Sequence, residues 1–234
     1  MCGRYITPDQ AALEREWATL PRDIEYFQSF NFAPTMQGPV VVDVDEDPEK
    51  VNDRERAVVL MTWGFQPHWA KRLWINARAE TVFEARAFAK DAKRHRCLVI
   101  AAAWYEWTGD KAPRQPHLFR RKDGRTFAFA GVSTNRKVDD EWISTYAILT
   151  TDANDLSAPI HDRMPLIVHP LAYDAWLSPH SEPQDYRAAL ESPDDEDAVF
   201  EIYAVTKAVN SPKNDSPELV NRVSLGGGVN LDNH

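Results

Sequence analysis

Short apolar runs separated by polar turns make up most of the chain. Runs of this length, rich in β-branched and aromatic residues, are typical of strands. The pattern predicts strands over residues 39–44, 57–61, 97–107, 118–121, 127–132, 145–150, 165–168 and 200–205. The chain is therefore expected to be built mainly from β-structure.

Helical periodicity is confined to shorter segments. The pattern predicts helices over residues 8–20, 80–92 and 171–177. In the first of these, Leu13, Trp17 and Leu20 repeat at spacings of four and three, which places them on one face. We expect Thr7 to be the N-cap of this helix, with Gln10 completing a capping box.

Together these elements predict one α+β domain with a mainly antiparallel, barrel-like β-sheet and flanking helices. The sequence shows neither an internal repeat nor a linker between domains. We expect the domain to span residues 1–221. Residues 222–234 contain three consecutive glycines and no periodic pattern, which predicts a disordered tail.

Length and composition set limits on the kind of protein. With 234 residues, of which 43% are hydrophobic, the chain can bury a well-formed core. No uninterrupted apolar stretch reaches about 18 residues, and the amino-terminal segment is not that of a signal peptide. We therefore expect a cytoplasmic protein without a membrane span. The two cysteines, Cys2 and Cys97, predict no structural disulfide, because Cys97 lies in an apolar run.

The net charge of −9 is unevenly distributed. Residues 43–56 carry seven acidic and three basic side chains, and residues 182–201 carry eight acidic and one basic. Residues 71–96, in contrast, carry eight Lys or Arg against three acidic residues. A basic face that binds nucleic acid is therefore compatible with the acidic total, as is an ordinary solvated helix surface.

The second residue is a cysteine, and removal of Met1 would give it a free α-amine. An α-amino group has a pKa of about 7.7–8.0, against about 10.4 for lysine, so far more of it is nucleophilic at pH 7. The thiol supplies a second nucleophile. Such an aminothiol can condense with an aldehyde to an imine, which the thiol closes to a thiazolidine. Alternatively, the thiol attacks an amide carbonyl with the amine as base, or Cys2 simply follows the start codon.

Three further polar groups interrupt apolar surroundings. Asn76 follows an aromatic stretch, and Glu106 lies inside an apolar run that should raise its pKa into the range useful for proton transfer. A strand-end carboxylate paired with an arginine is the alternative for Glu106. His161, flanked by Asp162 and Arg163 at the entrance to a strand, is a candidate for acid–base or oxyanion chemistry.

A fourth polar cluster follows the last predicted strand. It consists of Lys207, Asn210, Lys213 and Asn214. These residues could bind phosphate, although a plain surface loop fits the spacing equally well. The seven histidines are scattered and the glycines form no phosphate-binding loop, so we expect neither a metal nor a nucleotide cofactor.

Six motifs, taken together and in this order, resemble those of the SOS-response-associated peptidase (SRAP) family, relatives of the hydroxymethylcytosine-binding embryonic-stem-cell-specific protein. They are Met1-Cys2-Gly3-Arg4-Tyr5, Asn31-Phe32-Ala33-Pro34, Trp63-Gly64-Phe65, Ile75-Asn76-Ala77-Arg78-Ala79-Glu80, Trp104-Tyr105-Glu106-Trp107 and Ile160-His161-Asp162-Arg163-Met164-Pro165. Each motif is weak by itself, but six in register over nearly the whole chain are specific.

The resemblance implies a sensor of abasic sites in single-stranded DNA, including sites at single-strand/double-strand junctions. It implies a covalent crosslink through Cys2 that shields the site from strand cleavage, and self-removal of Met1 by autopeptidase chemistry. We expect a monomer that needs no cofactor, contacts no membrane and is nucleoid-associated when bound to DNA. The acidic stretches 43–56 and 182–201 should then point away from the DNA.

The resemblance also assigns roles to residues. Asn76 matches the amide that orients Cys2, Glu106 the carboxyl that moves protons and His161 the histidine beside the ribose-derived chain. The implied arginine contacts to the DNA backbone are Arg4, Arg78 and Arg163. Trp69 or Trp74 would offer a surface on which bases stack. With the lysines of the fourth cluster, the expected DNA-binding set is Arg4, Trp69, Arg78, Arg163, Lys207 and Lys213.

Two other classes of function remain open from the sequence. An amidohydrolase of the glutamine-amidotransferase type also begins Cys-Gly, but it needs an ammonia-accepting domain for which 234 residues leave little room. A non-catalytic module that binds single-stranded DNA would use the basic residues without the thiol.

Overall fold

The computed structural model describes residues 2–17, 24, 26–44, 55–182, 186 and 199–224. Most of the two acidic stretches, 43–56 and 182–201, lies outside the described residues, as do residues 225–234 of the predicted tail. The expectations about their orientation and disorder therefore stay predictions.

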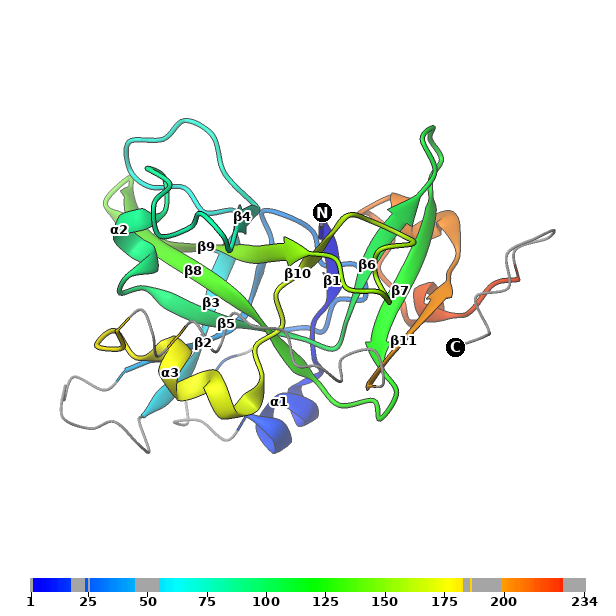
Figure 1. Ribbon diagram of the computed structural model, residues 1–234, viewed down its shortest axis with the longest axis horizontal. Coiled ribbons are helices and arrows are strands. Elements are labelled where there is room, and N and C mark those ends of the chain that lie inside the picture. Colours follow the sequence, from blue (N-terminus) through cyan, green and yellow to red (C-terminus); the bar gives the residue numbers. More distant parts are fainter. Residues whose placement is uncertain are drawn as a thin grey trace.

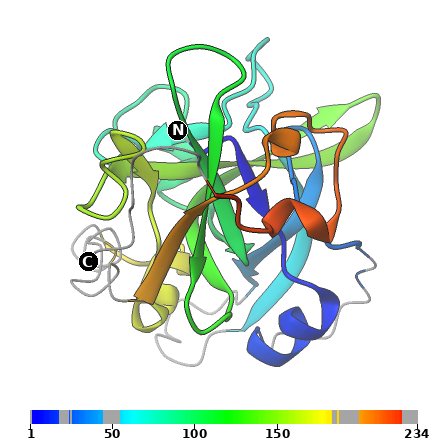
Figure 2. The ribbon, with the colours of Figure 1, turned by 90° about the vertical axis from the view of Figure 1, so that its right-hand side faces the viewer.

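Two β-sheets form the body of the molecule (Figures 1 and 2). The first sheet has four strands in the order β1 (Arg4–Ile6), β6 (Ala103–Thr108), β7 (Gln115–Arg121) and β11 (Phe200–Ala204). The second has seven strands, β2 (Gln37–Asp43), β3 (Arg56–Trp63), β4 (Asn76–Arg78), β5 (Arg96–Ala101), β8 (Phe127–Val138), β9 (Glu141–Asp152) and β10 (Arg163–Pro165).

Pairing of β8 with β9 closes β9, β3, β2, β5 and β8 into a ring, with β4 and β10 added along β9. β3 and β4 run parallel to β9, and the remaining neighbours of both sheets are antiparallel. The predicted α+β fold with a mainly antiparallel, barrel-like sheet is confirmed.

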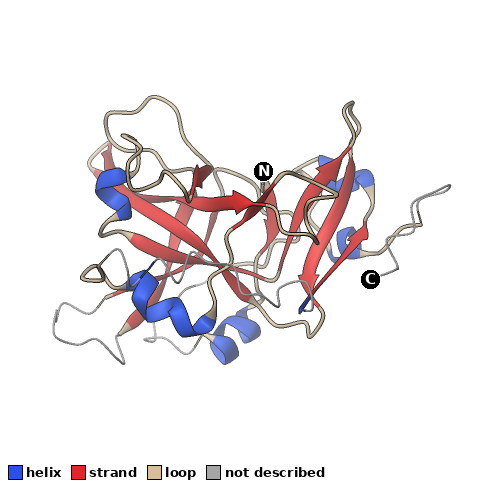
Figure 3. Cartoon of the chain, viewed as in Figure 1, coloured by secondary structure: helices blue, strands red, loops and turns tan. Residues whose placement is uncertain are grey.

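The helices are short and lie around the sheets (Figure 3). The α-helices are α1 (Gln10–Glu16), α2 (Ala89–Ala92) and α3 (Tyr173–Leu177), and the 3₁₀ segments include η1 (Pro170–Ala172), η3 (Lys207–Asn210) and η4 (Pro217–Val220). Within the described ranges, no helix is both long enough and apolar enough to cross a membrane.

Three local predictions were wrong, and a fourth, the strand over residues 165–168, is displaced to β10, which ends at Pro165. Asp9, not Thr7, caps α1, because the Asp9 carboxylate accepts the Ala12 N–H at 2.6 Å while the Thr7 hydroxyl accepts the Ser29 N–H. Residues 80–88 form successive turns, so the predicted second helix is reduced to α2. The predicted strand 97–107 divides at Ala102 into β5 and β6, which belong to different sheets.

A shared core joins the two sheets where the chain begins. Cys2 packs in one cluster with Tyr5 and Trp104 of the first sheet and with Trp63 and Tyr146 of the second. The Tyr5 and Tyr146 hydroxyls are hydrogen-bonded to each other at 2.7 Å, and both side chains are fully buried. In Figure 1, β1 accordingly lies in the middle of the molecule, between the second sheet and β6.

Candidate active site

Asn76 connects the second sheet to the first residues of the chain. Its side-chain Nδ2 donates a 2.8 Å hydrogen bond to the backbone carbonyl of Cys2. The neighbouring carbonyl of Ile75 accepts the Trp63 indole N–H at 2.8 Å and the Ile148 N–H at 3.0 Å. Because β4 is anchored in this way, the contact fixes the backbone of Cys2.

Cys2 is fully buried beside an acidic neighbour. Its thiol lies 3.8 Å from the Arg4 carbonyl, a long contact in which sulfur is the donor. Burial raises the pKa of the Cys2 thiol well above its usual value, and the charge of Glu106 raises it further. The thiol is therefore protonated at neutral pH and needs a base before it can act as a nucleophile.

Glu106 lies on β6 with 3% of its surface exposed. Burial raises the pKa of Glu106 to about 7, the positive charge of the chain's amino terminus opposes the shift, and Asp162 adds to it. The predicted rise is confirmed. His117, directly opposite Glu106 on β7, is buried with Nε2 2.9 Å from the Thr108 hydroxyl. Burial lowers the pKa of His117, so this neighbour is uncharged at neutral pH.

His161 lies in the loop between β9 and β10. Its Nδ1 lies 2.7 Å from the Asp162 carboxylate and accepts the Arg163 backbone N–H at 3.0 Å. Burial lowers the pKa of His161, as do the positive charges of the amino terminus and Arg114, whereas Asp162 raises it. The charge of the amino terminus thus acts on both His161 and Glu106.

The structure therefore brings the four predicted catalytic residues together at the junction of the two sheets. They are Cys2, Asn76, Glu106 and His161. A buried protonated thiol, a carboxyl that titrates near neutrality and a polarised imidazole are suited to carbonyl chemistry that includes loss of water.

The three predicted DNA-binding arginines differ in their surroundings. Arg4 is half-buried and Arg78 is exposed on β4, and in the described part of the chain neither forms an ion pair. Arg163 donates to both oxygens of Glu80, at 2.8 and 2.9 Å, and to Asp152 at 2.5 Å. Two carboxylates thus neutralise Arg163, an arrangement that the sequence did not indicate.

Trp69 belongs to a cluster of aromatic rings and guanidinium groups on the surface. It is 50% exposed, and its ring centroid lies 6.2 Å from that of Trp74. The guanidinium of Arg86 lies 5.5 Å from the Trp69 ring, and that of Arg72 lies 5.0 Å from the Trp74 ring. This cluster combines stacking faces with positive charge, as single-stranded nucleic acid requires.

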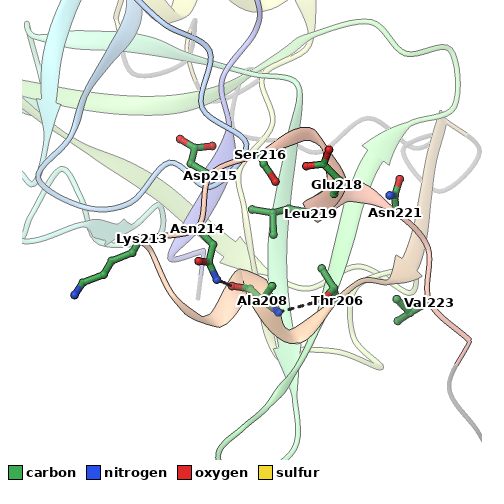
Figure 4. A pocket seen from close by; sticks show the side chains of 10 residues that line it. All are labelled: Thr206, Ala208, Lys213, Asn214, Asp215, Ser216, Glu218, Leu219, Asn221 and Val223. Atoms are coloured by element: carbon green, nitrogen blue, oxygen red, sulfur yellow. Dashed lines mark hydrogen bonds between the residues drawn. The ribbon is translucent and has the colours of Figure 1, made fainter.

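Lys207 and Lys213 lie elsewhere, around η3 near the end of the described chain. Lys213 lines an open cleft of about 720 Å³, but its side chain points away from the centre (Figure 4). Asp215 and Glu218 line the same cleft, so its charges are mixed. The cleft does not include any of the four predicted catalytic residues.

A family model described as SOS response associated peptidase (SRAP) matches residues 1–212. The chain belongs to the SRAP family. It is 36% identical over 230 residues to the abasic site processing protein YoqW of Bacillus subtilis, covering 94% of this chain and 99% of that relative. Abasic site processing protein YedK of Escherichia coli is 28% identical over 230 residues, which cover 95% of this chain and 100% of YedK. A crystal structure from Bacteroides thetaiotaomicron shares the fold, with a TM-score of 0.77, 22% identity and coverage of 95% and 100%.

Sequence reasoning missed three residues around this SRAP site. Glu80, the carboxylate partner of Arg163, belongs to the motif that contains Arg78, but the sequence alone indicated no role for it. Arg114 lies in the turn between β6 and β7, and its effect on His161 depends on the fold. His117 faces Glu106 because of strand register. Among the described residues, no group of three or more His, Cys, Asp or Glu is arranged to hold a metal ion.

Proposed function

We propose that this SRAP protein recognises abasic sites in single-stranded DNA and joins itself covalently to them through Cys2. The observation that carries the proposal is the hydrogen bond from Asn76 to the Cys2 carbonyl, beside a carboxyl, Glu106, whose pKa is about 7. Relatives that are named abasic site processing proteins support the choice of substrate.

The proposed reaction begins with the amine. Once Met1 has been removed, the Cys2 amine adds to the aldehyde of the ring-opened abasic sugar and forms a C–N bond. Glu106 gives a proton to the hydroxyl of this adduct, which leaves as water, and the Glu106 carboxylate then takes the proton from the nitrogen, so that a neutral imine remains. The Cys2 sulfur then bonds to the imine carbon, its proton passes to the nitrogen, and a thiazolidine results. The raised pKa of the thiol supports this order, because a protonated thiol is the weaker first nucleophile.

In the proposal, the same groups also remove Met1. Hydrolysis of the Met1–Cys2 peptide bond consumes one water and releases methionine. In the proposal, Cys2, Glu106 and His161 act as nucleophile, proton carrier and polar partner, as the family name peptidase suggests.

DNA would reach this site across positively charged and aromatic surfaces. In the proposal, Arg4 and Arg78 contact phosphates and the half-exposed Trp69 stacks on a base. Arg163 keeps its proposed contact only if phosphate competes with its carboxylate partners. Lys207 and Lys213 would contact another part of the strand.

Intact mass spectrometry of the protein before and after incubation with an abasic single-stranded oligonucleotide tests the proposal. We expect loss of the Met1 mass, then an adduct of protein plus oligonucleotide minus water that survives denaturant. Cys2→Ala should form no adduct, and an intact strand without an abasic site should not react. Full retention of Met1 in material that forms the adduct would contradict the mechanism. Sustained ammonia release from glutamine would favour the amidohydrolase instead.

A further inference from the structure

Two different contacts meet at one ring nitrogen of His161. The backbone N–H of Arg163 donates to Nδ1 at 3.0 Å, and Oδ1 of Asp162 lies 2.7 Å from the same atom. An imidazole nitrogen is either an N–H donor or a lone-pair acceptor. The N–H of Arg163 requires the acceptor form and the carboxylate of Asp162 requires the donor form, so the two contacts serve different protonation states.

In the neutral state the contact with Arg163 decides the tautomer. Arg163 begins β10 and its guanidinium is held by Glu80 and Asp152, so its backbone N–H cannot turn away. The side chain of Asp162, in contrast, is 87% exposed and can turn into water. The neutral imidazole therefore accepts at Nδ1 and carries its proton on Nε2.

In the charged state the second proton is added at Nδ1, where the Asp162 carboxylate can accept it in a charge-assisted hydrogen bond, and the Arg163 N–H loses its acceptor. The proton on Nε2 is unaffected by this step. Both charge states of His161 thus present an N–H from Nε2, and Nδ1 faces the protein's own loop in each.

We propose that Asp162 and Arg163 are positioning residues that keep a proton on Nε2 of His161, so that His161 is a permanent hydrogen-bond donor to the oxygen of the opened sugar. Proton exchange during the reaction is then the task of Glu106. This assignment rests on the proposed function and adds to it the two residues that set the tautomer of His161.

The charged groups around His161 come from several elements. The positive charges of the amino terminus and of Arg114, before β7, disfavour a charged imidazole, and Asp162 in its own loop favours it. Glu106 on β6 responds to the same amino terminus and to Asp162. Removal of the Asp162 charge should therefore disfavour the charged imidazole.

Long-range ¹H–¹⁵N NMR of histidine-labelled protein without DNA tests the tautomer directly. His161, assigned by comparison with His161→Gln, should show the Nε2–H form above its titration midpoint. Asp162→Asn should lower that midpoint, and Asp155→Asn, which removes the same charge from the same exposed loop, should leave it unchanged. A neutral Nδ1–H form would overturn the proposal, and so would an unmoved midpoint in Asp162→Asn. None of these readings depends on reaction with DNA.

Crosslinking rates test the role of the donor. Glutamine at 161 offers an N–H near the position of Nε2 but does not titrate, so His161→Gln should keep at least about a tenth of the wild-type rate. His161→Ala should lose roughly 100-fold, as for removal of a single oxyanion donor. Equal loss in both variants, with NMR spectra that show both folded, would overturn the assignment. If the wild-type protein formed no adduct at all, the proposed function would fail while the tautomer result stood.

Discussion

The side-chain amide of Asn76 holds the backbone carbonyl of Cys2 at 2.8 Å, across the junction between two sheets. Asn76 begins β4, which is anchored in parallel to β9, whereas Cys2 lies two residues before the start of β1 in the other sheet. Together with the shared core, this contact fixes the reactive end of the chain relative to the strand that carries Arg78.

Loss of this contact should slow the reaction more than it weakens DNA binding. An unsatisfied buried carbonyl costs about 1–3 kcal/mol, and Asn76→Ala also frees the end that must be oriented, so we expect crosslinking to slow by about 10-fold or more. Asn76→Asp should behave similarly, because a carboxylate cannot donate. Single-turnover rates at saturating abasic DNA measure the effect. Asn135→Ala, at an exposed position of β8, is the control, and an unchanged rate for both Asn76 variants would count against the contact.

The rate should depend on pH in a way that identifies Glu106. The amine must be neutral, with a pKa of about 7.7–8.0, and Glu106 must be protonated, with a pKa of about 7. The wild-type rate should therefore rise and then fall with pH. Glu106→Gln should be slower by about 100-fold at pH 7 and should lack the falling limb. If the crosslinking rate of Glu106→Gln still declined at high pH, the decline would be caused by a group other than Glu106.

The same carboxyl makes a prediction for stability. The pKa of Glu106 in the folded protein is about 7 against 4.5 as its ordinary value, so the folded state binds the proton more tightly. Its stabilisation is complete below pH 4.5 and is lost as the pH rises through 7, by about 3 kcal/mol in all. Glu106→Gln lacks this loss. Urea unfolding at pH 5 and pH 8 measures this. The free energy of unfolding of the variant, relative to wild type, should be higher at pH 8 than at pH 5. An equal difference at both pH values would show that the Glu106 carboxyl is not desolvated.

Arg78 and Arg114 should contribute to DNA affinity through phosphates. Both are exposed and free of ion pairs within the described ranges. Arg78→Gln and Arg114→Gln should each reduce the slope of log affinity against log salt by about one, on Cys2→Ala protein, where binding is reversible. Arg120→Gln removes an exposed arginine that is paired with Glu201 at 2.7 Å, and it should leave the slope unchanged. If all variants had the same slope, Arg78 and Arg114 would not contact DNA phosphates.

Local patterns predicted most strands correctly but failed where tertiary contacts decide. Residues 97–107 contain no turn signal, and the chain changes sheets there because the Ala102 N–H donates to the Ile6 carbonyl at 2.8 Å. Alanine-rich residues 80–88 turn instead of forming a helix, and directly before them the Ala79 N–H donates to the Thr150 carbonyl at 2.9 Å. Backbone contacts with residues distant in sequence thus outweighed propensity.

In the candidate site, too, features that depend on neighbouring residues were predicted and features that depend on tertiary contacts were not. The raised pKa of Glu106 followed from its apolar neighbours, because desolvation can be inferred from adjacent residues. That Asn76 touches Cys2 required the resemblance, since 74 positions separate them. The sequence could not predict that carboxylates pair with Arg163, because the register of β9 and β10 brings Asp152 beside it.

The ion pair between Glu80 and Arg163 should stabilise the fold in a pH-dependent way. Its two hydrogen bonds hold the pKa of Glu80 below its usual range. The stabilisation is therefore present above the ordinary pKa of about 4.5 and is lost as the pH falls through the lowered value. Because Glu80 is 45% exposed, we expect Glu80→Gln to cost only about 1 kcal/mol at pH 7. The difference from wild type should shrink as the pH falls through the lowered pKa of Glu80, and a cost that stays constant in acid would indicate lost packing instead.

The buried pair of Tyr5 and Tyr146 offers a test of how the two sheets are joined. Tyr5→Phe removes one hydroxyl and leaves the other buried without its 2.7 Å partner, which should cost about 1–3 kcal/mol, and Tyr146→Phe should cost a similar amount. The double variant should be less destabilised than the sum of the two, because no orphaned hydroxyl remains. Urea unfolding of the four proteins at one pH gives this coupling energy. Strict additivity would mean that the hydroxyls do not interact, and the junction beneath Cys2 would then depend on ring packing.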